Sequence, residues 1–266
     1  MEVELIIDPP GSGAWNMAVD EMLLEAAARD GRRVLRFYQW SAPTLSLGYF
    51  QRLSQREEHL ESRTCAVVRR ATGGGAILHD RELTYSFVGP EQGLGGHQAL
   101  YDLFHETLVE WLLAGRVEAR RHGTATGATC SQPEAPSRSR GERTDEPFLC
   151  FQRRAEGDVV AWSRIGAEKG EFKICGSAQR RWKSALLQHG SLLLERSSFA
   201  PQLPGLGELS RLSPSPAEVW RAWTERIARR TGWRWRESRI SPVESDSATR
   251  LQFERYGTHS WTGRRA

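Results

Sequence analysis

The 266-residue sequence predicts a globular protein that is built from both helices and strands. Short apolar runs that end at proline or glycine are typical of strands, and longer segments with apolar residues three or four positions apart are typical of amphipathic helices. The two kinds of segment follow one another from end to end of the chain. At this length the protein can bury a sizeable core in one large domain or two small ones.

The expected strands begin near the N-terminus, where Pro9, Pro10 and Gly11 end the first one. They cover residues 3–7, 34–40, 44–49, a run ending at 68, 83–87, 158–162, 171–179, 184–187 and 190–194. The expected helices follow apolar residues at helical spacing, as at Met17 and Leu24. They cover residues 14–28, 55–60, 98–113, 216–229 and 245–256.

Residues 123–147 contain few large apolar residues and many Gly, Ser, Thr, Pro and Arg. A segment this polar cannot fold by itself, so we expect a flexible insertion and not a domain boundary. The predicted organisation is therefore a single domain over residues 1–266, interrupted by this insertion.

The composition excludes several classes of protein. Hydrophobic residues make up 39% of the chain and no apolar run approaches the roughly 18 residues that span a bilayer, so no membrane segment is expected. The acidic N-terminus does not resemble a signal peptide, which favours the cytoplasm. Four cysteines (Cys65, Cys130, Cys150 and Cys175) lack paired spacing, so reduced thiols are favoured over disulfides or a metal site.

The net charge of +4 comes from arginines that are scattered among acidic residues. No lysine-rich tail is present, so we expect no nucleic-acid partner, and the positive field equally favours acidic proteins.

The three lysines, Lys169, Lys173 and Lys183, lie close together in the sequence. Lysine, unlike arginine, can give up a proton in a protein, so this cluster indicates a place where proton transfer is needed. For Lys169 an exposed loop position is an equally good interpretation.

Residues 69–80 contain Arg69, Arg70, three consecutive glycines (Gly73, Gly74 and Gly75) and His79. Glycine loses the most backbone freedom on folding, so three in a row indicate a close approach of the backbone to a ligand. Arginines beside such a loop suit an acidic group. The alternative is a glycine-rich hairpin with solvated arginines. The spacing matches neither a dinucleotide-binding nor a P-loop motif.

Several blocks of the sequence resemble the lipoate/biotin protein ligase superfamily. RRATGGGAILHD is similar to its RRxTGGGAxxHD signature, and FKICGSAQ and QHGSLLL are similar to its lysine-containing and QHGS blocks. NMAVD and the tail RYGTHSW also resemble family segments, with Arg255 in place of a lysine. The resemblance implies an α+β fold, a mixed β-sheet with packed helices, in which the glycine loop and Lys173 surround a medium-chain acyl group.

Cys150 and Phe151 resemble the position that carries the acyl thioester in LipM-type octanoyltransferases. This implies transfer of an octanoyl group from octanoyl-acyl carrier protein, through Cys150, to a lysine of a lipoyl-domain protein, without a cofactor. Acceptors of this kind are the glycine cleavage H protein and 2-oxoacid dehydrogenase E2. Lys173 then lowers the pKa of the thiol and serves as base.

The resemblance also places other residues. Arg70 and the three glycines of residues 73–75 bound the acyl pocket, His79 lies close to the acyl carbonyl, and Gly176 and Ser177 offer N–H groups to the oxyanion.

Alternatives remain open at this stage. An ATP-dependent lipoate–protein ligase would use ATP and Mg, although its usual accessory domain has little room in 266 residues. A lipoyl amidotransferase and a basic, non-catalytic binding protein are the others. Strand alternation would place Lys173 and Cys175 on one face, with Phe172 and Ile174 on the other, so Cys175 is a second candidate nucleophile.

Overall fold

The computed structural model describes residues 1–123, 147–165 and 168–265. Nearly all of the expected insertion, including Cys130, therefore lies outside the described residues. Among the described residues, no helix combines the length and apolar character that crossing a bilayer requires.

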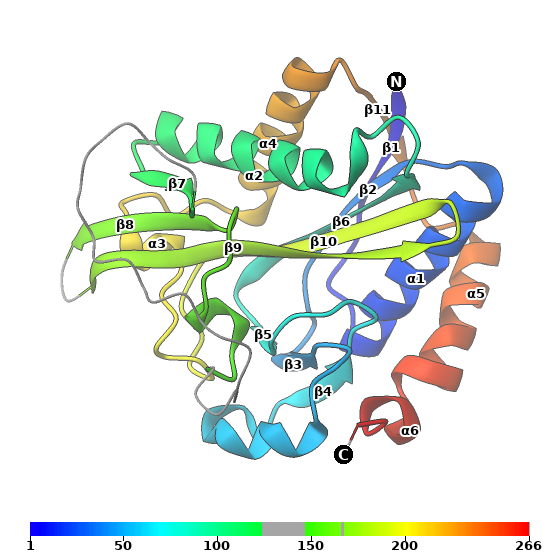
Figure 1. Cartoon of the computed structure of the whole chain (residues 1–266), viewed down its shortest axis with the longest axis horizontal. Coiled ribbons are helices and arrows are strands. Elements are labelled where there is room, and N and C mark those ends of the chain that lie inside the picture. Colours follow the sequence, from blue (N-terminus) through cyan, green and yellow to red (C-terminus); the bar gives the residue numbers. More distant parts are fainter. Residues whose placement is uncertain (124–146, 166–167, 266) are drawn as a thin grey trace, which may run out of the picture.

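An eight-stranded sheet crosses the molecule (Figure 1). In spatial order its strands are β11 (Arg234–Ser238), β1 (Glu2–Ile7), β2 (Val34–Tyr38), β6 (Glu82–Pro90), β10 (Ala185–Leu193), β9 (Glu168–Trp182), β8 (Val159–Ile165) and β7 (Ala119–Arg121). β1 is parallel to β11 and β2, and the other neighbouring pairs in this order are antiparallel. The sheet is mixed, and the predicted α+β class is confirmed.

Helices cover both faces of this sheet (Figure 1). One face packs against α1 (Gly13–Asp30) and α5 (Pro242–Leu251), and the other against α2 (Gly96–Ala114) and α4 (Pro216–Thr231). Local sequence fixes where the helices begin. Ser12 caps α1 by accepting from the N–H of Trp15, and Ser215 forms a capping box with Glu218 at the start of α4.

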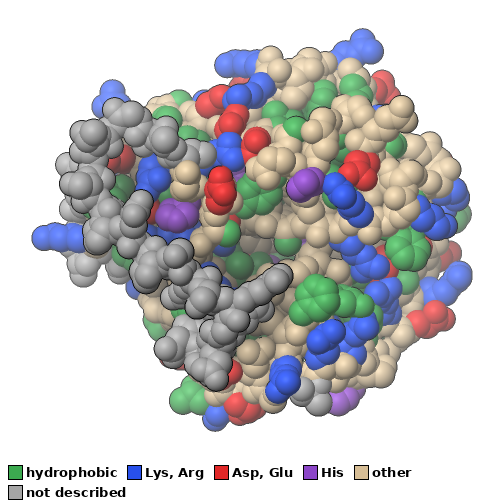
Figure 2. Space-filling model, viewed as in Figure 1, with side chains coloured by type: hydrophobic (Ala, Val, Ile, Leu, Met, Phe, Trp, Pro, Cys, Tyr) green, Lys and Arg blue, Asp and Glu red, His purple; other side chains and the backbone are tan. Residues whose placement is uncertain are grey.

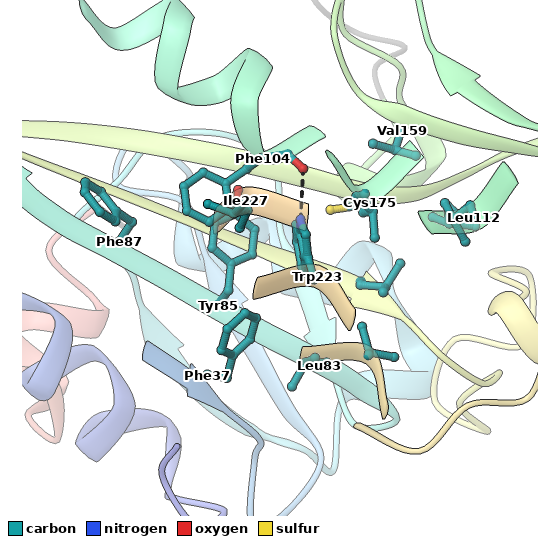
Figure 3. Packing of buried hydrophobic residues seen from close by; sticks show 14 of the residues in the cluster. Phe37, Leu83, Tyr85, Phe87, Phe104, Leu112, Val159, Cys175, Trp223 and Ile227 are labelled. Carbon is teal, nitrogen blue, oxygen red and sulfur yellow. Dashed lines mark hydrogen bonds between the residues drawn. The ribbon is translucent and has the colours of Figure 1, made fainter. Parts of the chain in front are cut away.

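The face under α2 and α4 holds an aromatic core (Figure 3). Trp223 of α4 donates its indole N–H to the carbonyl of Phe104 at 3.2 Å, and Tyr85 of β6 stacks on the Phe104 ring. Cys175 of β9 belongs to the same apolar cluster. Among the described residues, this face of the sheet is therefore filled by buried apolar side chains.

A second, three-stranded sheet carries the glycine loop. Its order is β4 (Ala66–Arg69), β3 (Thr44–Leu47) and β5 (Ile77–His79). The short helices η1 (Leu53–Glu58) and η2 (Leu60–Ser62) connect β3 to β4. The remaining elements are short: η3 (Cys150–Gln152), α3 (Leu206–Leu209), η4 (Gln252–Tyr256) and α6 (His259–Thr262).

β9 contains a β-bulge opposite β8. Val159 pairs with Cys175 and Val160 with Lys173, so Ile174 is an extra residue between them. Ile174 and Cys175 both lie in the aromatic core, whereas Lys173 reaches the opposite side of the sheet, where it contacts η3. The prediction that Lys173 and Cys175 share a face is therefore wrong, because alternation does not survive a bulge.

Most expected elements are present, with boundaries shifted by a few residues. The two strands expected at 184–187 and 190–194 form one strand, β10, because Gly190 continues the pairing with both β6 and β9. The sequence patterns missed β5, β7 and β11. The first two have three residues each, and β11 is a polar edge strand, so none gives a clear period.

Candidate active site

A pocket of about 490 Å³, including its open mouth, lies between the glycine loop, η3 and the strands β9 and β10. This volume is ordinary for a small-molecule site. Apolar parts of its wall come from Met17, Trp40, Ile77, Phe151 and Ala178. Most of the predicted site residues line it, namely Arg70, Gly73, Gly74, His79, Cys150, Gly176 and Ser177. The other two, Gly75 and Lys173, pack against Cys150.

The glycine loop follows a path that side chains would block. A Cβ on Gly48, just after β3, would lie 1.9 Å from the carbonyl oxygen of Gly74. Gly74 itself has φ +95°, a conformation that L side chains rarely adopt. A Cβ on Gly75 would lie 3.2 Å from Cα of Cys150. Glycine therefore allows the loop to lie tightly between β3 and Cys150.

Both arginines beside this loop are buried, so the alternative of solvated arginines is wrong. Arg69 donates to the carbonyls of Gly48 and Gln51 at 2.9 and 2.6 Å, and to the carbonyl of Thr262 at 2.7 Å. It thereby joins the start of the glycine loop to the C-terminal segment. Its role is structural, since these carbonyls occupy its N–H groups.

Arg70 borders the pocket. It donates to the carbonyl and hydroxyl of Ser46 at 2.7 and 2.6 Å and to the carbonyl of Gly75 at 2.9 Å. Burial lowers the pKa of Arg70 to about 10, and the negative charge of Cys150 acts in the opposite direction. Among the described residues no carboxylate pairs with it. Arg70 therefore holds the loop and presents a positive charge to the pocket at neutral pH.

His79 lies on the pocket wall and stacks on Trp40, with ring centroids 3.7 Å apart. Burial lowers its pKa, although Glu82 beside Nδ1 opposes this. Because a carboxylate can only accept, Nδ1 carries the proton, and Nε2 accepts from the hydroxyl of Ser46 at 2.6 Å. His79 is therefore a neutral, fully bonded wall residue.

Cys150 begins η3 and is fixed to the glycine loop. Its N–H donates to the carbonyl of Ala76 at 2.7 Å, and Leu149 forms a bridge with Ala76. The side chain lines the pocket and is partly exposed. Two segments that are far apart in the sequence thus come together to place this thiol.

Lys173 approaches Cys150 from β9. Its ammonium group donates to the Cys150 sulfur at 3.7 Å and pairs with Asp158 at 2.8 Å. Burial lowers the pKa of Lys173, but the negative charges of Cys150 and Asp158 outweigh this, so that its pKa is raised. A Cβ on Gly176 would lie 2.5 Å from Cε of Lys173. Gly176 therefore provides the space across which Lys173 reaches Cys150.

Cys175 has no access to the pocket. It is fully buried in the aromatic core, and burial raises the pKa of its thiol well above its usual value (Figure 3). A thiol that stays protonated is neither a nucleophile nor a ligand. The structure thus separates the two candidate cysteines, with Cys150 at the pocket and Cys175 in the core.

The backbone at Gly176 and Ser177 lies at the pocket wall, just beyond the point where the pairing with β8 ends. The Ser177 side chain faces the core, where its hydroxyl lies 2.7 Å from both Tyr85 and His105. Any direct contribution of Ser177 to the pocket is therefore from its backbone.

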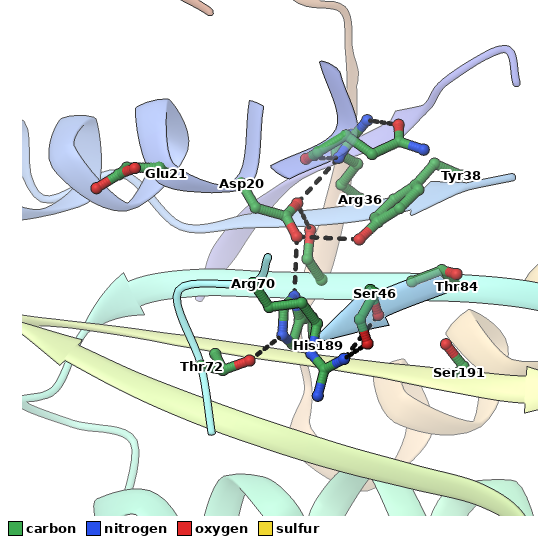
Figure 4. Close-up of polar contacts among 12 residues, drawn as sticks. Asp20, Glu21, Arg36, Tyr38, Ser46, Arg70, Thr72, Thr84, His189 and Ser191 are labelled. Carbon is green, nitrogen blue, oxygen red and sulfur yellow. Dashed lines mark hydrogen bonds and ion pairs between the residues drawn. The ribbon is translucent and has the colours of Figure 1, made fainter. Parts of the chain in front are cut away.

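Sequence reasoning missed a buried network that supports the other side of the glycine loop (Figure 4). Asp20 of α1 accepts from Arg36 at 2.9 Å and from Tyr38 and His189 at 3.0 Å. Burial raises the pKa of Asp20, but His189 and Arg36 outweigh it and lower the pKa. Nε2 of His189 in turn forms a hydrogen bond with the hydroxyl of Thr72 in the loop, at 2.7 Å. The sequence signal that could have revealed this network is that Asp20 and His189 belong to the NMAVD and QHGS blocks, which resemble family segments.

Residues 12–202 match the family described as the lipoyl protein ligase A/B catalytic domain. Octanoyltransferase LipM from Kyrpidia tusciae is 33% identical, with 96% of each chain covered. The chain belongs to the LipM octanoyltransferase family. The LipM from Carboxydothermus hydrogenoformans is 30% identical over 94% of each chain. Membership makes the protein an acyltransferase of protein lipoylation, as the sequence blocks predicted.

Solved structures support the same fold. A bipartite lipoate protein ligase from Thermoplasma acidophilum, solved as part of an archaeal lipoylation system with its E2 lipoyl domain, has a TM-score of 0.71 at 21% identity, covering 99% of this chain and 96% of that one. Lipoate-protein ligase A bound with ATP also gives a TM-score of 0.71, at 22% identity and 99% coverage of both chains. At this identity these structures show the LipM fold to be that of the ligase catalytic domains.

Proposed function

We propose that the protein moves an octanoyl group from octanoyl-acyl carrier protein to a lysine of a lipoyl-domain protein, through a thioester on Cys150. The observation that carries the proposal is the contact between the Cys150 sulfur and the Lys173 ammonium, 3.7 Å apart at the wall of the pocket. Membership of the LipM family supports the octanoyl group. We infer that the reaction takes place in the cytoplasm and requires no ATP.

In the first half-reaction the Cys150 thiolate attacks the carbonyl carbon of the donor thioester. The Lys173 ammonium stabilises the thiolate before attack, with Arg70 as a second positive charge on the pocket wall. The donor's C–S bond breaks, and its sulfur leaves with a proton from Lys173. The products are octanoyl-Cys150, the free thiol of the carrier and neutral Lys173.

In the second half-reaction the neutral amine of the acceptor lysine attacks the thioester. Lys173 takes one proton from the nitrogen, the C–S bond to Cys150 breaks, and the thiolate and the ammonium are restored. One thioester is exchanged for another and then for an amide, so activation by a nucleotide is unnecessary. Backbone N–H groups at Gly176 and Ser177 stabilise the oxyanion in both steps.

The pocket fits the acyl chain by its chemistry. Met17, Trp40, Ile77 and Phe151 give it an apolar wall. Positively charged side chains gather on the lower right of the face shown in Figure 2, with few acidic ones among them. Such a surface attracts acidic proteins. Both the donor and the acceptor of the proposed reaction are proteins. The glycine cleavage H protein and 2-oxoacid dehydrogenase E2 are the acceptors we propose.

The proposal is tested by intact-protein mass spectrometry after mixing with octanoyl-acyl carrier protein without ATP. The wild type and Cys175→Ala should both gain an octanoyl group that hydroxylamine removes, whereas Cys150→Ala should gain none. Loss of the adduct only in Cys175→Ala would move the nucleophile to the core. Absence of an adduct in the wild type, together with ATP-dependent modification of a lipoyl domain, would make the protein a ligase.

A further inference from the structure

Asp158 contacts Lys173 but does not reach the pocket. Its carboxylate lies 2.8 Å from Nζ of Lys173, and both side chains are almost completely buried. Asp158 is located immediately before β8, opposite the bulge in β9. The pair is therefore formed by the same irregularity that directs Lys173 toward Cys150.

The position of Asp158 does not depend on Lys173. The N–H of Ala155 donates to its carboxylate at 2.7 Å, and the hydroxyl of Tyr101 donates at 3.1 Å. A carboxylate held by two further donors is a fixed anchor for the flexible lysine side chain. Nζ is thereby kept 3.7 Å from the Cys150 sulfur.

Apart from the Cys150 sulfur, the other groups facing Lys173 carry no charge at neutral pH. From α2, burial raises the pKa of Tyr101 and lowers the pKa of His105 to about 4, so both are neutral. From η3, the Phe151 ring lies 5.4 Å from Nζ. Across β9, Cys175 remains a thiol. Among the described residues, Asp158 is the carboxylate that balances the charge of Lys173.

This charge balance has opposite effects on the two half-reactions. Asp158 offsets the field of Lys173 at Cys150, so it does not promote ionisation of the thiol. It does increase the proton affinity of Nζ, which burial alone would reduce. A lysine with higher proton affinity is the better acceptor for the proton of an attacking amine.

We infer that Asp158 is a positioning residue for the second half-reaction, which holds Nζ of Lys173 beside the thioester and strengthens it as the base for the acceptor amine. The inference rests on the proposed function. Its proton balance is that of the two half-reactions, because only Lys173 exchanges a proton with the substrates.

Rapid-quench measurements on Asp158→Asn separate the two steps. Formation of octanoyl-Cys150 should stay within about threefold of the wild type, whereas transfer from octanoyl-Cys150 to a lipoyl domain should slow by about tenfold or more. The rise of the transfer rate with pH should also move to lower pH, because Lys173 loses its counter-charge. Asp30→Asn, an exposed carboxylate on α1, is the matched control and should change neither step.

Asp158→Glu keeps the negative charge but moves it by one methylene group. This variant provides a second test in case Asp158→Asn does not fold. It should slow transfer by about threefold and leave the pH dependence in place. Equal slowing of both steps with an unmoved pH dependence, in either variant, would reduce Asp158 to a structural residue and overturn the inference. A wild type that forms no octanoyl-Cys150 would instead refute the proposed function itself.

Discussion

On one face of β9, Lys173 and Gly176 adjoin the pocket, whereas on the other face Cys175 and Ser177 lie in the aromatic core. Both faces bury groups able to ionise. On the pocket face Lys173 remains charged, because Asp158 compensates for the loss of water. On the core face no described residue of opposite charge contacts Cys175, which remains a neutral thiol.

The difference shows that burial by itself does not decide whether a group is reactive. Of the two buried groups on β9, the one that contacts a fixed opposite charge keeps its own charge, and the one without such a contact is neutral. We therefore expect substitutions on the pocket face to change rates, and those that break the buried pair of Lys173 and Asp158 to lower stability as well. Substitutions on the core face should lower stability and leave the rates unchanged.

Among substitutions on the two faces of β9, replacing Lys173 with methionine should give the largest change in the rate of acylation. We expect octanoyl-Cys150 to form about 10²–10⁴-fold more slowly, because the thiolate loses its counter-ion and the leaving sulfur loses its proton donor. The rate is measured by intact mass over time. Lys169→Met, at an exposed position of the same strand, should acylate at the rate of the wild type. A similar loss of rate in both lysine variants would show that the effect does not depend on the contact with Cys150.

His105 tests the core face through pH. Burial lowers its pKa from 6.5 to about 4, although the bond from Nδ1 to the carbonyl of Gly157 acts in the opposite direction. In the neutral ring Nε2 accepts from the hydroxyl of Ser177. The folded-state pKa is the lower one, so this stability is present above pH 6.5 and is lost as the pH falls toward 4. We expect a decrease of roughly 3 kcal/mol in the free energy of unfolding.

Urea unfolding at several pH values measures this decrease. His105→Gln should be less stable at neutral pH and should show a flatter pH dependence over the same interval. An unchanged slope in the variant would mean that other groups cause the acid sensitivity.

Cys175→Ser should destabilise the fold without changing the chemistry. A hydroxyl in the aromatic core loses its hydrogen bonds to water, so the free energy of unfolding should fall by about 1–3 kcal/mol. Thermal and urea unfolding measure the loss. The rate of octanoyl-Cys150 formation should remain that of the wild type, and a parallel drop in rate would contradict the assignment of Cys175 to the core alone.

Gly176→Ala should give the smallest effect. It should change the rate of acylation and leave stability unchanged. The new methyl group would displace Cε of Lys173, which lies 2.5 Å from the ideal Cβ position. Because a flexible side chain can move aside, we expect stability to be preserved, while acylation slows by about tenfold. Gly207→Ala, where the nearest atom to a Cβ is 3.5 Å away, is the control. A large loss of stability in Gly176→Ala would show that the Lys173 side chain cannot move to accommodate the methyl group.

Much of this site could be predicted from the sequence, because its parts lie in short, distinctive blocks. The three glycines of residues 73–75, Lys173 and the Cys150–Phe151 pair each stood out by composition or by resemblance. Their convergence followed from the resemblance, since no local pattern relates residues so far apart. The roles of Cys150 and Lys173 stay a prediction until the acyl-enzyme is measured.

The remaining parts depend on geometry that local patterns do not encode. The bulge in β9 reverses the face of Cys175, and a single extra residue leaves no compositional sign. Asp158 precedes a strand outside any recognised block, so its pairing with Lys173 was invisible. The contact between Asp20 and His189 joins α1 to β10 across 169 positions. Such contacts arise only when the sheet has assembled.

The bond from Arg69 to the carbonyl of Thr262 joins two parts of the chain that are 193 positions apart. In a growing polypeptide, Arg69 leaves the ribosome long before Thr262 has been made. The glycine loop thus gains this brace only after Thr262 has been made, when the core strands are already available. A nascent chain can therefore adopt much of its sheet before the segment around Thr262 docks beside the glycine loop.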